Sequence, residues 1–325
     1  MKNPQRTKRH HFVPECYLKP FEEEGQFYVL DIQKLRKGYN EFPKGSNASK
    51  ICYLEDFYRL EFDEYMNNAK AGEDDLFIES KVLTQLEGKY GGLINRLIKD
   101  QVLSRKDCVD LCDFIIQLKL RNPYWLKNTI EENKNDWLDK LSGQLYEEKF
   151  KLDPRFAGMP DDYKELVYLL AVEERKADAK FSKKMHQFSL IERFATDSKR
   201  NEKFRRQIID CVWQIYKCPP NGPFFITTDN PGVSIGHDNL LYNTKFIGGF
   251  IFYLPLSPQY CLTISDALKD HFYSSEQDSK QIFTVDIEGS HVIEVNDRVI
   301  QRINKLLIGM DDWYLKQIAD NNRPK

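Results

Sequence analysis

The chain has 325 residues, of which 41% are hydrophobic and 30% are charged. This composition excludes a disordered polar chain and is typical of a globular protein with a sizeable core. The 48 Lys and Arg residues are balanced by 50 Asp and Glu residues, so no global positive charge indicates nucleic-acid binding, and any such contact must use a local basic patch.

The N-terminal stretch 9–14 contains two adjacent histidines, His10 and His11, out of only six in the chain. Pro14 disfavours helix in the residue before it, so the stretch is expected to be extended. Neighbouring side chains of an extended segment point to opposite faces, which predicts that one histidine lines a site and the other packs. The alternative is a solvated basic tail, since Lys2, Arg6, Lys8 and Arg9 lie beside the pair.

The periodicity divides the chain into three regions that are expected to form one compact unit. Residues 1–72 hold the histidine arm and short strands at 26–31, 51–53 and 57–62. Residues 73–218 are helical, with predicted helices at 76–97 (interrupted by Gly91-Gly92), 108–120, 124–150, 163–181 and 201–216. Residues 219–325 are rich in strands, at 224–228, 246–253, 260–264 and 282–287, before a closing helix at 293–308.

The segment 108–120 is apolar nearly all round, which predicts the buried central helix of the fold. Ser104 and Asp107 resemble a capping box at its start, and Pro123 is well placed to begin the next helix. We therefore predict an α+β fold, in which a helix-rich middle region packs on a mainly antiparallel sheet built from N- and C-terminal strands. Helix should exceed strand by about two to one.

The seven cysteines form no Cys-x-x-Cys pair, which argues against a disulfide framework and against a zinc ribbon. The longest apolar run, 246–256, is too short to cross a bilayer, and the charged N-terminus has no apolar signal region. The sequence thus predicts a cytoplasmic protein with no membrane contact.

Several motifs resemble, in order, those of an uncharacterised microbial family, domain of unknown function 4238. The motifs are His10-His11-Phe12-Val13-Pro14 with Tyr17-Leu18 and Phe21, the strand-like run 27–31, Asp56-Phe57-Tyr58, Leu120-Arg121-Asn122-Pro123, the run 225–231 and the run 254–258. The pairs Glu15-Cys16 and Lys19-Pro20 depart from that pattern. The resemblance spans nearly the whole chain, and it implies no established activity.

Five further residues are candidates for chemistry in addition to the histidines. Asp229 and Asn230 follow a buried strand at a turn, where they either serve a site or bond their own backbone. Arg121 ends the apolar helix, where its guanidinium either clamps a phosphate or carboxylate or satisfies the last helix carbonyls. Glu79 is a weaker carboxylate candidate, and a thiolate of Cys16 paired with histidine is a remote option.

The resulting hypothesis is a phosphodiester hydrolase of the nuclease type. His10 or His11 would be the general base, Arg121 the phosphate clamp, and His11 with Asp229 the ligands of a divalent Mg, Mn or Zn ion. Arg9, Asn230 and Tyr17 would contact the substrate. The ββα-metal nuclease arrangement is disfavoured because no histidine occurs between His11 and His186. The alternative is a non-catalytic binding or regulatory protein whose histidine arm is structural.

Overall fold

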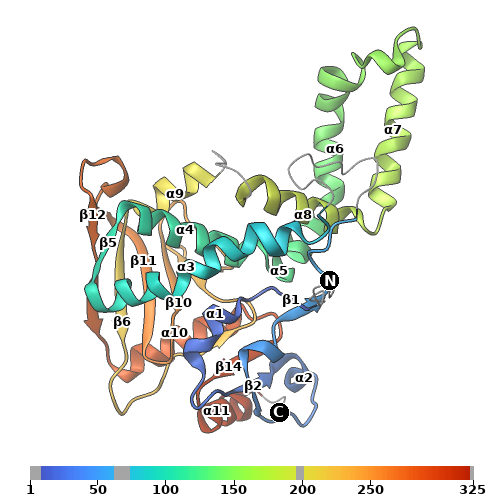
Figure 1. Ribbon diagram of the computed structural model, residues 1–325. Helices are drawn as coiled ribbons and strands as arrows, with labels where there is room; N and C mark the ends of the chain where they lie inside the picture. Colours follow the sequence, from blue (N-terminus) through green and yellow to red (C-terminus); the bar gives the residue numbers. More distant parts are fainter. Residues whose placement is uncertain (1–8, 62–73, 195–200, 323–325) are drawn as a thin grey trace, which may run out of the picture.

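The computed structural model describes residues 9–61, 74–194 and 201–322. Helix makes up 50% and strand 21%, so the predicted α+β class and the twofold excess of helix are confirmed. The strands are divided mainly between a six-stranded and a four-stranded sheet, which Figure 1 shows side by side in the body of the molecule.

The six-stranded sheet is formed by the C-terminal half of the chain and has the order β13-β6-β11-β10-β8-β9. Its pairs are antiparallel except that β13 runs parallel to β6. Its strands are β6 (Cys211–Lys217), β8 (Val233–Gly236), β9 (Leu241–Tyr242), β10 (Phe250–Pro255), β11 (Tyr260–Lys269) and β13 (Phe283–Asp286). Helices cover both faces, so apolar side chains on each side of the sheet are buried.

The predicted helix over 201–216 is wrong in its second half. Helix α9 (Glu202–Ile209) ends early, and β6 begins at Cys211. In β6 the buried side chains alternate, with Cys211, Trp213 and Ile215 inside. Buried residues at every second position, with β-branched and aromatic residues among them, are the pattern of a strand. A short apolar run can also fit helical spacing, so the strand pattern is missed when only the helical spacing is considered.

The four-stranded sheet joins the two ends of the chain in the order β3-β2-β14-β7. The strands are β2 (Phe27–Asp31), β3 (Lys44–Ser46), β7 (Thr227–Thr228) and β14 (Leu306–Gly309), flanked by α2 (Ile32–Arg36) and α11 (Asp312–Asn322). N- and C-terminal strands therefore do pair, as predicted, but only in this smaller sheet. The predicted closing helix is α10 (Gly289–Gln301), and its expected last turns form β14 instead.

Helix α4 (Arg105–Leu120) is the buried central helix that the sequence predicts. The Ser104 side chain accepts a hydrogen bond from the Asp107 N–H, as expected for its cap. Helix α3 (Thr84–Asn95) packs beside it, flanked by the π-helical turns η3 (Ile78–Leu83) and η4 (Arg96–Asp100). Gly91-Gly92 were expected to bend or break this helix, and the break is absent, because α3 runs through both glycines.

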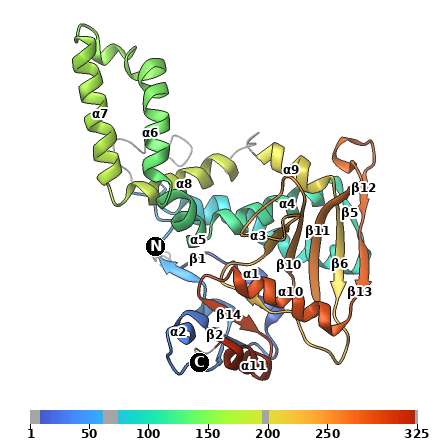
Figure 2. The ribbon, with the colours of Figure 1, turned by 180° about the vertical axis from the view of Figure 1, so that it is seen from behind.

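The remaining middle helices include a hairpin that projects away from the body, as Figures 1 and 2 show from opposite sides. These elements are α5 (Pro123–Trp125), η5 (Leu126–Glu131), α6 (Lys134–Leu145), η6 (Tyr146–Phe150), η7 (Pro154–Phe156), α7 (Asp161–Ala177) and α8 (Phe181–Phe194). The hairpin is closed by its own aromatic cluster of Tyr146, Phe150 and Tyr168. It therefore carries a small core separate from the main one.

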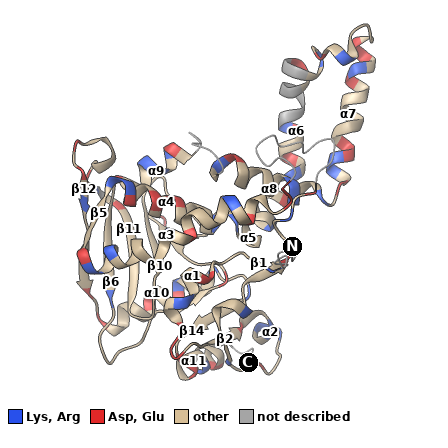
Figure 3. Cartoon of the chain, in the orientation of Figure 1, with Lys and Arg blue, Asp and Glu red and all other residues tan. Residues whose placement is uncertain are grey.

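Short elements complete the described chain. Strand β5 (Val102–Ser104) pairs with β12 (Ser279–Gln281), and single turns form α1 (Glu15–Leu18), η1 (Lys19–Phe21), η2 (Ala48–Lys50) and η9 (Phe272–Ser274). Among the described residues, none of the helices is both long and apolar enough to span a membrane. Figure 3 shows Lys and Arg mixed with Asp and Glu along helices such as α4 and α7.

Tyr17 is fully buried and ties the N-terminal arm to two distant strands. Its hydroxyl lies 2.8 Å from the Thr227 hydroxyl and donates to the Pro255 carbonyl at 2.6 Å. The sequence hypothesis gives Tyr17 a contact with substrate, whereas the structure places its side chain in the core. Its hydrogen bonds join segments more than 200 positions apart.

We expect Tyr17→Phe to lower the free energy of unfolding by about 1–2 kcal/mol, because Thr227 and Pro255 then lose a buried partner. Urea denaturation followed by circular dichroism measures the change. Tyr39→Phe is the matched control, since Tyr39 is 63% exposed and should give the wild-type midpoint. Equal midpoints for both variants would contradict the role assigned to the Tyr17 hydroxyl.

Candidate functional site

The N-terminal arm is a strand, β1 (Arg9–His11), which pairs antiparallel with β4 (Tyr53–Glu55). His10 and His11 point to opposite faces of this ribbon, as the sequence predicts. His10 is buried, its Nδ1 accepts the Tyr58 N–H at 2.8 Å, and its ring stacks on Tyr58. His10 therefore attaches the ribbon to the core, and His11 faces the other way.

His11 lies in a half-enclosed position beside Tyr53, and its side chain is 13% exposed. Its Nδ1 is 3.7 Å from the nearer carboxylate oxygen of Glu15. Burial lowers the pKa of His11 below 6.5, Arg121 lowers it further, and Glu15 and Glu87 oppose both effects. The imidazole is therefore mainly neutral at pH 7, and its buried Nε2 has no hydrogen-bond partner among the described residues.

Arg121, at the end of α4, lies next to His11 and is the most buried charge of the site, at 1% exposure. Its guanidinium donates to Glu87 at 2.5 Å and to the His11 carbonyl, and it lies over the Tyr58 ring. Burial is the largest single effect and lowers the pKa of Arg121, but the charge and hydrogen bond of Glu87, together with Tyr58 and Glu79, outweigh it and raise the pKa. Both terminal nitrogens of the guanidinium thus bind groups of the protein rather than the last carbonyls of α4.

Two carboxyl groups flank Arg121, and sequence reasoning noted only one of them. Glu79 on η3 has a pKa raised to about 7, chiefly by burial, while Arg121 opposes the shift and Glu87 adds to it. Its Oε2 is buried and accepts no hydrogen bond from the described residues. Glu87 on α3 was missed, although its spacing of eight residues from Glu79 corresponds to two helical turns and places both on one face.

The structure gives Asp229 and Asn230 other neighbours. An oxygen of the Asp229 carboxylate accepts the N–H groups of Asn304 (3.1 Å) and Lys305 (3.0 Å), which fixes the turn before β14. Burial raises the pKa of Asp229 to about 6, and these backbone bonds oppose the rise. Asn230 accepts a hydrogen bond from Lys119 at 3.0 Å. His11 and Arg121 are thus brought together by direct contact, whereas the carboxylate of Asp229 bonds backbone N–H groups at the start of β14.

The remaining candidates are placed as follows. Arg9 is exposed on the same ribbon as His11, with its guanidinium over the Tyr53 ring, while Lys2, Arg6 and Lys8 lie outside the described residues. All seven cysteines are free, and burial raises the pKa of the Cys16 thiol to about 12, which disfavours a thiolate. Within residues 9–61, 74–194 and 201–322, no group of three or more His, Cys, Asp or Glu side chains is arranged to hold a metal ion.

A comparison with protein families matches residues 9–312 to the family described as "Protein of unknown function (DUF4238)". The chain belongs to this family. The resemblance stated from the motifs is confirmed over nearly the whole sequence. No curated protein and no solved structure matches the chain.

The motifs that identify this DUF4238 protein meet in space although they are spread along the sequence. Tyr58, of the Asp-Phe-Tyr motif, bonds both His10 and the Arg121 carbonyl. Asn122, of the Leu-Arg-Asn-Pro motif, donates to the Asp229 carbonyl at 2.7 Å. Tyr17 reaches the run that includes Thr227. With the bond of Tyr17 to the Pro255 carbonyl, these buried polar groups join the motifs of five segments.

Breaking the ion pair between buried Arg121 and partly exposed Glu87 should destabilise this DUF4238 protein strongly. We expect Arg121→Met to lower the free energy of unfolding by about 3–5 kcal/mol, because Glu87 loses its partner. Replacing both members, Arg121→Met with Glu87→Leu, should restore at least half of the loss, since no unpaired charge remains.

Urea denaturation of the two single variants and the double variant gives the coupling. Arg155→Met is the control, because Arg155 is exposed in its pair with Asp153 and its loss should leave the midpoint unchanged. If Arg121→Met unfolds at the wild-type urea concentration, the pair does not hold the site together.

Proposed function

We propose that this DUF4238 protein is a hydrolase that cleaves phosphodiesters by general acid–base catalysis, with nucleic acid as its substrate class. One observation carries the proposal: His11 and Glu79, both neighbours of the Arg121–Glu87 pair, have pKa values moved toward each other. Near pH 7 one is an unprotonated imidazole and the other a carboxyl that keeps its proton in part. A base and an acid in one environment are what ester hydrolysis requires.

The roles follow from the proton each group holds. Nε2 of His11 accepts a proton from the attacking water, whose oxygen forms the new bond to phosphorus. The bond from phosphorus to the leaving oxygen breaks, and Glu79 donates its proton to that oxygen. Both proposed atoms, His11 Nε2 and Glu79 Oε2, have hydrogen-bonding capacity that the described residues do not use. Both atoms are closed off from solvent in this structure, so the proposal requires a local opening that admits a substrate and its water.

Arg121 acts in this proposal as a positioning residue and not as the phosphate clamp of the sequence hypothesis. Its terminal nitrogens are occupied by Glu87 and by the His11 carbonyl, so it orients the strand that carries the base. Among the described residues, Arg9 is a cation placed to meet the substrate, because it is exposed and lies 4.8 Å from the centre of the Tyr53 ring beside His11. A diester anion approaching His11 would meet this guanidinium.

The second candidate is a non-catalytic protein whose histidine arm is structural. The burial of His10 and its hydrogen bond with Tyr58 favour this structural role, since they explain the histidine motif without a substrate. A divalent metal stays part of the first proposal only as a prediction to be tested. We also propose a cytoplasmic location, which the seven free thiols support.

The pH dependence of hydrolysis tests the proposed pair. Activity on bis(p-nitrophenyl) phosphate and on a DNA oligonucleotide should fall as pH drops below the lowered pKa of His11, because the protonated imidazole accepts no proton. It should also fall as pH rises through about 7, where Glu79 loses its proton. The expected profile is a bell with its maximum between the lowered pKa of His11 and the pKa of Glu79. Equal rates with a chelator and with Mg²⁺, Mn²⁺ or Zn²⁺ would exclude a metal-assisted version.

The variants separate catalysis from folding. We expect His11→Asn to lose about 100-fold or more in kcat, and Glu79→Gln to lose the alkaline limb of the profile as well as rate, both with wild-type circular dichroism. His291→Asn and Glu132→Gln are matched controls on exposed positions and should keep full activity. Absence of diesterase activity in the wild type, together with folded variants, would favour the structural role of the arm.

A further inference from the structure

Helix α2 exposes three cations on one short segment. Ile32 and Leu35 of α2 are buried in the apolar cluster that this helix shares with α11. The other positions of the helix then face away from the core, so Lys34, Arg36 and Lys37 are exposed. The small sheet and α11 thus fix the backbone that carries these cations, while their side chains reach the surface.

The turn after α2 places an aromatic ring beside the cations. Gly38 has a φ of 84°, in the left-handed region that favours glycine, and its N–H donates to the Leu35 carbonyl at 2.9 Å. The Tyr39 N–H donates to the Lys34 carbonyl at 3.0 Å, which holds Tyr39 at the end of the helix. Tyr39 is 63% exposed, so a ligand can reach its ring.

The local charge at α2 is positive although the whole chain is balanced. The segment 32–50 contains five Lys and Arg residues and a single acidic residue, Glu41, which accepts a hydrogen bond from Lys44 at 2.7 Å. Asp31, just before α2, lies 3.5 Å from the Lys305 amine. Both acidic side chains thus pair with cations other than those of α2, which Figure 3 marks in blue. A polyanion would meet a local positive field at this surface.

Residues 1–8 and 323–325 lie outside the described residues, and their composition bears on this field. Their charged side chains are Lys2, Arg6, Lys8, Arg323 and Lys325. These two segments therefore bring no acidic side chain to the surface at α2.

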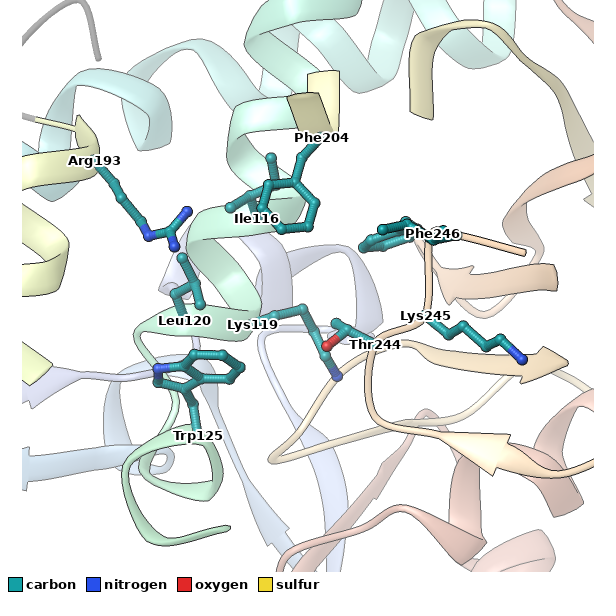
Figure 4. Close-up of a pocket in the computed structure, with 10 residues that line it drawn as sticks. Ile116, Lys119, Leu120, Trp125, Arg193, Phe204, Thr244, Lys245 and Phe246 are labelled. Carbon is teal, nitrogen blue, oxygen red and sulfur yellow. The ribbon is translucent and has the colours of Figure 1, made fainter. Parts of the chain in front are cut away.

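Exposure distinguishes the cations of α2 from a lysine of the interior. Lys119 lines a pocket of about 360 Å³ beside α4, which Figure 4 shows, and it is only 2% exposed. Its amine donates to the Asn230 side chain and to the carbonyls of Pro231 and Gly232. A phosphate backbone cannot reach an amine that is buried and bound in this way, whereas it can reach the cations of α2.

We propose that the α2 surface, formed by Lys34, Arg36, Lys37 and Tyr39, binds single-stranded nucleic acid. The three cations contact phosphates, and the Tyr39 ring stacks on a base. A base inside a duplex is stacked on both sides and offers no open face to a tyrosine. The chemistry of this surface therefore fits a single strand of DNA or RNA better than a duplex.

Figures 1 and 2 show α2 and the strand β1 on the same flank of the molecule. A nucleic-acid strand that extends from the α2 surface toward β1 would meet Arg9, the exposed cation beside His11. The α2 surface would then hold the substrate of the proposed hydrolase. This link to catalysis rests on the proposed function, whereas the binding of a single strand does not.

Fluorescence anisotropy with a fluorescein-labelled single-stranded DNA of about 12 nucleotides measures the binding. The titration is made with the wild type and with His11→Asn, which lacks the proposed base and keeps the strand intact. We expect saturable binding that weakens as the NaCl concentration rises. The same strand paired with its complement should bind at least fivefold more weakly. A Kd that does not change with salt, or equal affinity for the duplex, would overturn the proposal.

Variants of the α2 surface separate its two kinds of contact. The triple variant Lys34→Gln, Arg36→Gln, Lys37→Gln should weaken binding at least tenfold. It should also lower the slope of log Kd against log[NaCl] by about 2, because each phosphate contact to a single strand contributes about 0.7. Tyr39→Ala should weaken the single strand at least fivefold and leave the duplex unchanged, since only unstacked bases reach the ring. Tyr39→Trp should keep the wild-type affinity, because it keeps a stacking ring.

Matched variants remove the same kinds of side chain elsewhere. The triple variant Lys99→Gln, Lys127→Gln, Lys203→Gln removes three exposed cations, and Tyr163→Ala removes a ring that is 56% exposed on α7. Both should bind the strand as the wild type does. All the substituted side chains are exposed, so circular dichroism should show a folded chain for every variant.

Hydrolysis assays distinguish a failure of the surface from a failure of the proposed function. In a wild type that hydrolyses DNA, the α2 triple variant should raise KM for DNA at least tenfold and keep the rate with bis(p-nitrophenyl) phosphate, which has no further phosphates for the α2 surface. A wild type that binds the strand but hydrolyses neither substrate would contradict the proposed function and support the surface alone. Wild-type affinity in both the α2 triple variant and Tyr39→Ala would overturn the surface, whatever the hydrolysis assays show.

Discussion

The structure depends on a guanidinium that is buried away from water. Desolvating such a cation costs several kcal/mol, and only close partners offset the cost. Arg121 finds them in Glu87 from α3, the His11 carbonyl from β1 and the ring of Tyr58. Three segments are therefore fixed by one side chain. A three-residue strand such as β1 has few backbone bonds of its own, so this contact and the burial of His10 hold it in place.

The last turn of α4 distributes its polar groups in different directions. The Lys119 amine binds the turn 230–232, the Leu120 carbonyl bonds His186 of α8, and Asn122 reaches the Asp229 carbonyl. Consecutive residues on a helix point about 100° apart, so a short motif at a helix end contacts several elements at once. This geometry explains why the motif near Arg121 and the motif near Asp229 are both polar and both buried. The polar groups of each of these two segments find their hydrogen-bond partners in the other segment.

Sequence analysis predicted correctly the features that depend on residues close together in the chain. The all-round apolar pattern of 108–120 identified the central helix, and Pro14 with strand alternation separated the two histidines correctly. It failed at the apolar run after Cys211, which fits helical spacing as well as strand alternation. Pairing with β11 in the sheet makes this run a strand.

The site was predictable only in part for a similar reason. His11, Arg121 and Glu79 could be recognised as unusual residues in an apolar context. Which of them contact one another depends on the distances in the folded chain, and the sequence does not give these distances. The spacing from Glu79 was a signal for Glu87, but the local sequence does not show that this helical face meets Arg121. Asp229 looked like a site residue because a carboxylate at a strand end serves equally well as a catalytic group and as a turn acceptor, and its contacts with Asn304 and Lys305 are long-range.

The pairing of β2 with β14 also affects how the chain must be made. Asp31 pairs with Leu306, so about 275 residues must be translated after β2 before its partner strand exists. At roughly 5–20 residues per second, a nascent chain keeps this edge of β2 unpaired for tens of seconds. Chaperone protection during synthesis would matter most for this segment, because an unpaired strand edge is open to pairing with other chains. Completion of the small sheet thus has to wait for the synthesis of β14, whatever the order of folding in a test tube.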